Sequence, residues 1–208
     1  MKHKAYIFDF DGTLVHSNLI KRDAFYKLTP EILLHPEAVT EVLSKIPERS
    51  RFEIIAEIYK IINSKENESY APDRIALAIL NYSTAVRDGV LNCPELIGAT
   101  PLLKALKKAD CIVYISSNTP EESLGELIEG RQWSELINGF FGFPKLKNVT
   151  VKNILLTHAL NANDVIIIGD GDSDEMSAGE NGCDFYRINH ELSLKEFYES
   201  LITSTHHV

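Results

Sequence analysis

The sequence predicts an α/β protein with a doubly wound, Rossmann-like parallel sheet and an inserted all-helical cap domain. Three short apolar runs, "AYIF" at 5–8, "CIVYI" at 111–115 and "VIIIG" at 165–169, are separated by segments with helical patterning. Runs that are rich in β-branched and aromatic residues, and that do not alternate, are typical of parallel strands buried on both faces. Strands that alternate with helices in this way predict a doubly wound fold.

The segments between and after these runs complete the alternation. A weaker run, "DFYRI" at 184–188, is expected to extend the sheet. The stretch "TPEE" at 119–122 has the pattern of a capping box with proline in the first helical position, and Gly130 is expected to end that helix. Two more helices are expected, one opened by "TP" at 100–101 and one over 148–160, where apolar residues share one face.

A long segment between the first strand and Thr100 breaks the alternation. It contains no good strand and is expected to form four helices, one of which begins with a capping box of Ser50 and Glu53. A segment of this length is too long for a loop and predicts a separate module. We therefore assign 1–16 and 90–208 to the α/β core and 17–89 to the helical cap.

Composition and charge exclude several classes of protein. The 208 residues carry a formal net charge of −9, which argues against nucleic acid and against an anionic membrane as partners. We find no run near the roughly 18 apolar residues that span a bilayer, and no signal-peptide core. Cys93, Cys111 and Cys183 lack metal-ligand spacing, so we interpret them as reduced thiols of a cytoplasmic protein.

Polar residues follow three of the predicted strands. Asp9, Ser116 and Asp170 stand at the carboxyl ends, where open α/β sheets bind their ligands, so they predict one shared site. Asp11 and Asp174 add two carboxylates beside it. Carboxylates that converge on one sheet edge repel each other unless a cation lies among them. Hard oxygen ligands with room for water and phosphate suit Mg²⁺, and we expect Mg²⁺ here.

These motifs resemble those of a known family. "FDFDGTL" at 8–14, a strand that ends in Ser116, an upstream lysine and "IIIGDGDSD" at 166–174 are similar, in order and spacing, to the four motifs of the haloacid dehalogenase superfamily of phosphohydrolases. The insert resembles the helical, C1-type cap of phosphoglycolate phosphatase and β-phosphoglucomutase-like members. The resemblance implies a Mg²⁺-dependent phosphatase that hydrolyses a small phosphomonoester, such as a sugar phosphate, phosphoglycolate or a nucleotide.

The resemblance also implies roles for the carboxylates. Asp9 would be the nucleophile that becomes an aspartyl-phosphate, which splits one difficult displacement into two easier ones. Asp11 would be the general acid for the leaving alcohol and then the base that activates water. Asp170 would be the main metal carboxylate and Asp174 a second ligand or its support, with Asp9 and the backbone carbonyl of Asp11 as further ligands.

Two motif positions have competing candidates. Ser116 directly follows the apolar run and is preferred over Ser117 for the second motif. For the lysine, Lys147 fits best because it stands at the start of a helix, and Lys145 is the second choice. Lys152 is interpreted as a solvated helix residue.

Further residues are candidates for substrate binding. Gly12 and the backbone N–H groups of Ser117 and Asn118 are expected near the phosphate, although the latter two are also placed to cap the next helix. Arg51 resembles the arginine that some relatives use in the cap. Arg49 competes with it, and a surface arginine beside a helix start is the plainer interpretation.

Two alternatives to a phosphatase stay open. A phosphomutase of the β-phosphoglucomutase type would use the same aspartates and a helical cap. A receiver-type signalling module is more remote, because its phosphoacceptor follows the third strand and it has no place for the insert. His16, where the family often has an acidic residue, is interpreted as an exposed loop residue at the start of the cap hinge.

Overall fold

The computed structural model describes residues 2–47, 49–67, 69–70 and 72–205, and the chain divides into two compact units. The first, here called the α/β unit, consists of Met1–His16 and Cys93–Val208, and the second, the helical unit, is Ser17–Asn92. The predicted second boundary at residue 89 falls inside a helix that continues to Asn92. The boundary therefore lies three residues later than expected.

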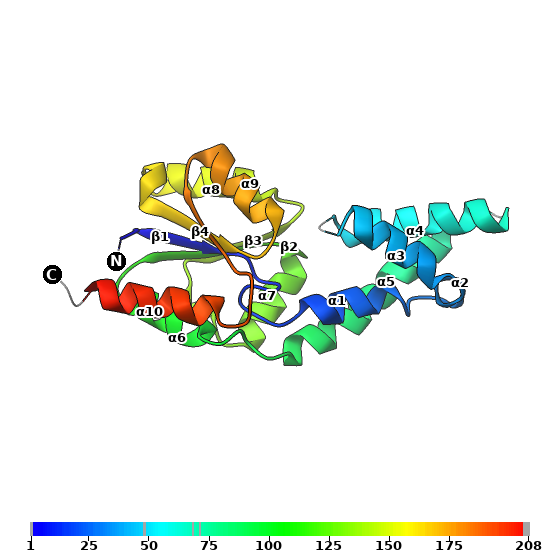
Figure 1. Cartoon of the computed structure of the whole chain (residues 1–208), viewed down its shortest axis with the longest axis horizontal. Helices are drawn as coiled ribbons and strands as arrows, with labels where there is room; N and C mark the ends of the chain where they lie inside the picture. Colours follow the sequence, from blue (N-terminus) through cyan, green and yellow to red (C-terminus); the bar gives the residue numbers. More distant parts are fainter. Residues whose placement is uncertain (1, 48, 68, 71, 206–208) are drawn as a thin grey trace. The chain divides into compact units, whose positions relative to one another are not determined.

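The α/β unit contains a five-stranded parallel sheet in the order β3-β2-β1-β4-β5 (Figure 1). The strands are β1 (Ala5–Phe8), β2 (Ile112–Pro120), β3 (Gly139–Phe143), β4 (Val165–Gly169) and β5 (Asp184–Arg187). This sheet confirms the predicted doubly wound fold. The three central strands are level with one another, because Phe8 of β1 pairs with Ile115 of β2 and with Ile168 of β4. The residues that follow these three positions therefore lie at the same edge of the sheet.

Helices cover both faces of the sheet (Figure 1). Helices α8 (Lys147–Thr157) and α9 (Asp172–Asn181) lie on one face, and α6 (Ala99–Lys108) and α10 (Ser193–Thr205) on the other. Helix α7 (Glu121–Gly130) packs against β2 and β3. On the α8 face, Ile7 and Ile167 belong to one buried cluster with Val151 and Ile154. Each such side chain, fully buried, contributes about 1.5–3 kcal/mol to folding.

The structure of this unit differs from the predictions in two respects. Strand β3 was not predicted, because "GFFGF" contains two glycines and forms a half-buried edge strand. The capping box expected at 119–122 is absent, because β2 continues to Pro120, and α7 begins at Glu121 without a side-chain cap. Gly142 allows this close packing of β3, since a Cβ there would lie 2.6 Å from the Thr119 carbonyl oxygen and closer still to the Glu121 backbone.

The helical unit has five helices among its described residues, where four were expected. They are α1 (Asn18–Phe25), α2 (Pro30–Leu34), α3 (Pro36–Lys45), α4 (Arg51–Glu66) and α5 (Pro72–Asn92). The predicted capping box of Ser50 and Glu53 is present at the start of α4. Ile55, Ile58 and Ile62 of α4 are fully buried, so this unit has an apolar core of its own.

None of the helices in the described part of the chain has the length and apolar character that crossing a bilayer requires.

Candidate functional site

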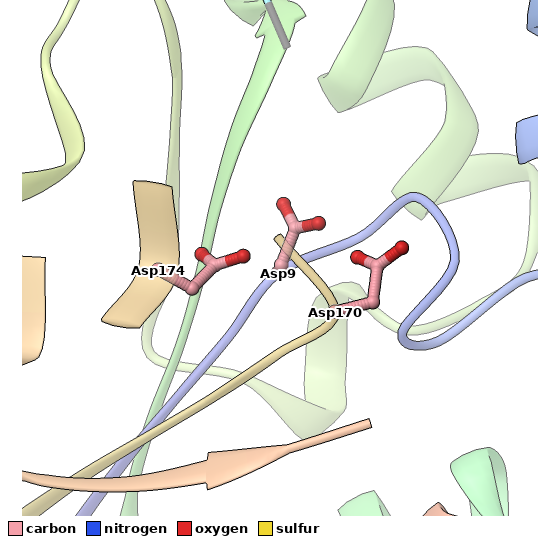
Figure 2. Close-up of side chains that lie close together, drawn as sticks. All are labelled: Asp9, Asp170 and Asp174. Atoms are coloured by element: carbon pink, nitrogen blue, oxygen red, sulfur yellow. The ribbon is translucent and has the colours of Figure 1, made fainter. Parts of the chain in front are cut away.

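Three aspartates meet at the carboxyl edge of the sheet (Figure 2). Asp9 follows β1, Asp170 follows β4, and Asp174 lies in the first turn of α9. One oxygen of each carboxylate lies within 4.8 Å of the others. The chain turns to opposite sides of the sheet after β1 and β4, and a doubly wound sheet binds its ligands at such a point. Asp9, Asp170 and Asp174, three of the residues that the sequence assigned to one shared site, are thus brought together.

A glycine allows Asp174 to reach the other two carboxylates. A Cβ at Gly169 would lie only 2.3 Å from Cγ of Asp174, so the aspartate side chain occupies the space beside the bare backbone. The backbone N–H of Gly171 donates a hydrogen bond of 3.3 Å to Oδ2 of Asp174. Both glycines of "GDGDSD" therefore shape the site, although neither was predicted to have a role.

Lys147 is buried between two of the carboxylates. Its Nζ donates hydrogen bonds to Oδ1 of Asp9 at 2.9 Å and to Oδ1 of Asp174 at 2.7 Å, and its side chain is only 8% exposed. Lys145 instead forms a surface ion pair with Glu121 at 2.8 Å, and Lys152 is exposed. Of the three candidate lysines, the preferred one lies in the site, because it opens α8 at the edge where Asp9 leaves the sheet.

The electrostatics of this cluster show an excess of negative charge. Burial raises the pKa of Asp9 well above its usual range; Lys147 opposes this rise, and the neighbouring carboxylates add to it. Burial likewise raises the pKa of Asp174. Burial alone would lower the pKa of Lys147, but Asp9 and Asp174 outweigh it and hold that pKa above its ordinary value. One buried ammonium group thus directly faces two buried carboxylates.

The donor set fits a small divalent cation. Octahedral Mg²⁺ holds oxygen ligands at about 2.1 Å, so ligands of one ion lie up to about 4.2 Å apart, close to the spread of the three carboxylates. Thr13 donates a hydrogen bond of 3.3 Å from Oγ1 to Oδ1 of Asp170, which helps to orient that carboxylate. Hard oxygen ligands with uncompensated negative charge are the chemistry that Mg²⁺ requires.

Asp11 is held by two hydroxyl groups from the end of β2. Its Oδ2 accepts hydrogen bonds from Oγ of Ser117 at 3.2 Å and from Oγ1 of Thr119 at 2.8 Å. Ser117 is the serine that contacts Asp11, whereas Ser116, preferred from the sequence for the second motif, is buried in β2 opposite Phe141 of β3, and its role stays a prediction. The register of β2 against β3 shifts between Ser116 and Pro120, and an apolar run does not reveal such an irregularity. Thr119 was missed, because a Thr-Pro pair before two glutamates is typical of a helix start.

The predicted phosphate-binding residues lie along the same edge. Gly12 adopts a positive φ of 75° directly after Asp11, a conformation that glycine reaches without strain. Its N–H donates to the carbonyl of Val15 at 2.9 Å, which closes the turn. Asn118 is exposed and stands between Ser117 and Thr119 in β2. The chain thus leaves the site through a tight turn.

The remaining candidates lie near or within the helical unit. Arg51 is the first residue of α4, and its guanidinium carbon lies 5.4 Å and 5.9 Å from the ring centroids of Phe52 and Tyr82. Burial lowers its pKa, and its Nε has no hydrogen-bond partner in the described residues. Arg49 is exposed and pairs with Glu53. His16, the last residue of the first α/β segment, is exposed as expected, and its N–H donates to a backbone carbonyl.

These features define a class of α/β enzymes whose acidic site lies between β1 and β4, where the chain turns to opposite sides of the sheet. They are the sheet order, the carboxylate cluster and the buried lysine. Residues 6–188 match the model of the family described as haloacid dehalogenase-like hydrolase. The chain therefore belongs to this family and is a hydrolase. The resemblance noted in the motifs is thus confirmed over most of the chain.

Solved structures of low sequence identity share the fold. A predicted phosphoglycolate phosphatase from Haemophilus somnus is 15% identical, with a TM-score of 0.73 and coverage of 99% of both chains. A candidate β-phosphoglucomutase from Thermotoga maritima is 13% identical, with a TM-score of 0.68 over 94% of this chain and 99% of that one. A haloacid dehalogenase-like hydrolase from Streptococcus pneumoniae is 19% identical, with a TM-score of 0.62 over 98% and 99%. No curated protein matches significantly by sequence.

Proposed function

We propose that the protein is a Mg²⁺-dependent phosphatase that hydrolyses a small phosphomonoester through a phosphorylated Asp9. The observation that carries the proposal is the ion pair of Asp9 with Lys147 at the end of β1, with a second carboxyl group, Asp11, two residues further on. A buried carboxylate beside a lysine is placed for nucleophilic attack, and the neighbouring carboxyl group is placed for proton transfer.

In the first half of the reaction, an oxygen of Asp9 bonds to phosphorus while the bond from phosphorus to the substrate alcohol oxygen breaks. Asp11 gives its proton to that oxygen. In the second half, Asp11 takes a proton from water, whose oxygen attacks phosphorus and releases Asp9 and inorganic phosphate. Lys147, whose Nζ lies 2.9 Å from Oδ1 of Asp9, opposes the rise in the pKa of that carboxyl group and orients it, which favours the ionised nucleophile.

The other residues would bind the ion and the phosphate. Asp9, Asp170 and Asp174, with the carbonyl of Asp11, would hold Mg²⁺, which when bound supplies positive charge against the carboxylates and the phosphoryl oxygens. We assign phosphate binding to the Ser117 hydroxyl, to Gly12 and to the backbone N–H groups at the end of β2.

The partner that we propose is a small phosphorylated metabolite in the cytoplasm, and not nucleic acid or a membrane. The net charge of −9 supports this, because a phosphodiester polymer would be repelled outside the cation site. A phosphomutase would use the same aspartates, and the appearance of free inorganic phosphate distinguishes the two reactions.

The test is turnover of an aryl phosphate, followed by release of inorganic phosphate. Asp9→Asn is expected to abolish it while the melting temperature stays within a few degrees, and chelation of divalent ions is expected to abolish it in the unaltered protein. Asp110→Asn is the matched control, because Asp110 precedes β2 at the opposite end of the sheet in a left-handed conformation that asparagine tolerates. Undiminished turnover in Asp9→Asn, or without divalent ions, would contradict the proposal.

A further inference from the structure

Thr119, a residue to which no motif assigned a role, forms a close contact with the side chain of Asp11. Its side chain is buried, with 7% of the residue exposed, and Oγ1 lies 2.8 Å from Oδ2 of Asp11. The Ser117 hydroxyl lies 3.2 Å from the same oxygen. Thr119 is therefore the nearer of these two hydroxyl donors to Asp11.

The backbone of Thr119 organises the second donor as well. Its N–H donates a hydrogen bond of 3.0 Å to Oγ of Ser117. A Ser or Thr hydroxyl that accepts from a backbone N–H two residues on is a common local turn, and it fixes where that hydroxyl can direct its own proton. Thr119 thus acts on Asp11 directly through its side chain and indirectly through Ser117.

The local fold commits Thr119 to this contact. Helix α7 begins after Pro120 without a side-chain cap, so the threonine does not act as the helix cap that its sequence context predicts. The end of β2 is held by the close approach of Gly142 in β3 to the Thr119 carbonyl. A buried hydroxyl held on a rigid strand end can keep a carboxyl group in one orientation at little entropic cost.

We propose that Thr119 is a positioning residue for Asp11, which it holds in the orientation required for proton transfer to the leaving group. This inference rests on the proposed function, in which Asp11 is the general acid and then the base. It also assigns the two hydroxyl groups different roles, because Thr119 holds Asp11 in place and the Ser117 hydroxyl, the longer contact at 3.2 Å, is the one assigned to the phosphate.

A positioning role predicts a dependence on the leaving group. An alcohol that is a poor leaving group needs the proton from Asp11 while the bond to phosphorus breaks, whereas nitrophenolate departs without it. The kinetic constant kcat/KM reports the steps up to loss of the leaving group, so it isolates this proton transfer from the later attack of water. Displacing Asp11 should therefore lower kcat/KM most for the most basic leaving groups.

The experiment measures kcat/KM of the full chain with Mg²⁺ for substituted phenyl phosphates, from p-nitrophenyl to p-methoxyphenyl phosphate. Thr119→Val, which keeps the shape and removes the hydroxyl, is expected to lose about 10-fold at the basic end and less than about 3-fold at the nitrophenyl end. Thr119→Ser is expected to restore the unaltered dependence. Thr119→Ala provides a second test should the valine variant unfold.

Thr150→Val is the matched control. Thr150 is a buried threonine of α8, 1% exposed, whose Oγ1 has no hydrogen-bond partner among the residues described. This variant should show the unaltered dependence on the leaving group, whereas a general packing defect would lower kcat/KM equally across the series.

A uniform loss in Thr119→Val, or a serine variant that behaves like valine, would overturn the positioning role. The proposed function is tested separately on the same series by Asp9→Asn. If Asp9→Asn is inactive throughout while Thr119→Val shows a uniform loss, only the role of Thr119 is wrong. If Asp9→Asn is active, the proposed function fails and the positioning role fails with it.

Discussion

The two units of the molecule place their charges differently. In the α/β unit, Lys147 forms ion pairs with Asp9 and Asp174, and all three side chains are at most 8% exposed. In the helical unit, ion pairs such as that of Lys65 with Glu37 lie at the surface, with 43% and 54% of the side chains exposed. Desolvating a charge costs several kcal/mol, whereas a surface pair contributes little. Buried charges therefore indicate chemistry in the α/β unit, whereas a surface pair such as that of Lys65 with Glu37 gives no such indication.

The largest effect is expected from Lys147→Met, which tests the difference between buried and surface ion pairs. Asp9 and Asp174 would remain buried without their ammonium partner, and breaking a buried pair in this way costs about 3–5 kcal/mol. Turnover of an aryl phosphate is expected to fall by about 100-fold or more, because the site loses preorganised positive charge. Denaturant unfolding and steady-state kinetics measure the two effects.

Lys145→Met is the control for this prediction. Lys145 stands two residues away and pairs with Glu121 at the surface, where 50% of the lysine side chain is exposed. An exposed pair contributes up to about 1 kcal/mol, so both stability and turnover should stay close to those of the unaltered protein. Equal effects of the two substitutions would show that burial of the ion pair has no functional meaning.

Lys147 also shows which parts of the site a sequence can reveal. A strand whose residues are all apolar can be recognised in the sequence, and the residues that follow it are then known. For this reason β1, β4 and the aspartates after them were predicted. Lys147 was found through the family resemblance, which implies a lysine at the start of a helix upstream of "GDGDSD". For the strands and the aspartates after them, local patterning and the geometry of the parallel sheet determine the position.

Features that depend on contacts between distant segments were not predicted. Strand β3 has half-buried residues and glycines, and Gly142 is required only because the backbone at Thr119 and Glu121 packs against it. Thr119 has the same local sequence as a helix cap, and only the approach of Asp11 determines where its hydroxyl points. The contact of Ser117 with Asp11 was likewise not predicted, since the register shift in β2 is a property of the sheet.

A prediction of intermediate size concerns the helical unit. Ser50 accepts a hydrogen bond from the N–H of Glu53 and is part of a capping box, so Ser50→Ala is expected to lower the free energy of unfolding by about 1 kcal/mol. Hydrogen exchange in α4 should rise with it. Ser44→Ala, an exposed serine within α3, is the control and should change stability by less than about 0.5 kcal/mol. If Ser50→Ala changes the free energy of unfolding no more than the control does, the capping box of α4 does not stabilise this unit.

The smallest expected effect is a pH dependence of the helical unit. The ring of His35 lies between two carboxylates, with Nε2 2.8 Å from Oε1 of Glu66 and Nδ1 3.3 Å from Oε1 of Glu37. Glu66 first, and then Glu37, raises the pKa of His35, while Lys65 and His35 lower the pKa of Glu37 to about 2. The histidine therefore binds its proton more tightly when folded, and the carboxylates stay ionised to accept from it.

The sign of the effect follows from this shift. A raised folded pKa contributes stability that is fully present below the unfolded pKa of about 6.5 and is lost as pH rises through the folded value. The free energy of unfolding should therefore decline slightly between about pH 6 and pH 8. His35→Gln should remove the part of this decline that is due to His35. His16→Gln, in the α/β unit, is the control and should leave that part in place. Unfolding free energies at the two pH values measure this. An unchanged decline in His35→Gln would mean that this surface cluster does not stabilise the folded unit through its charge.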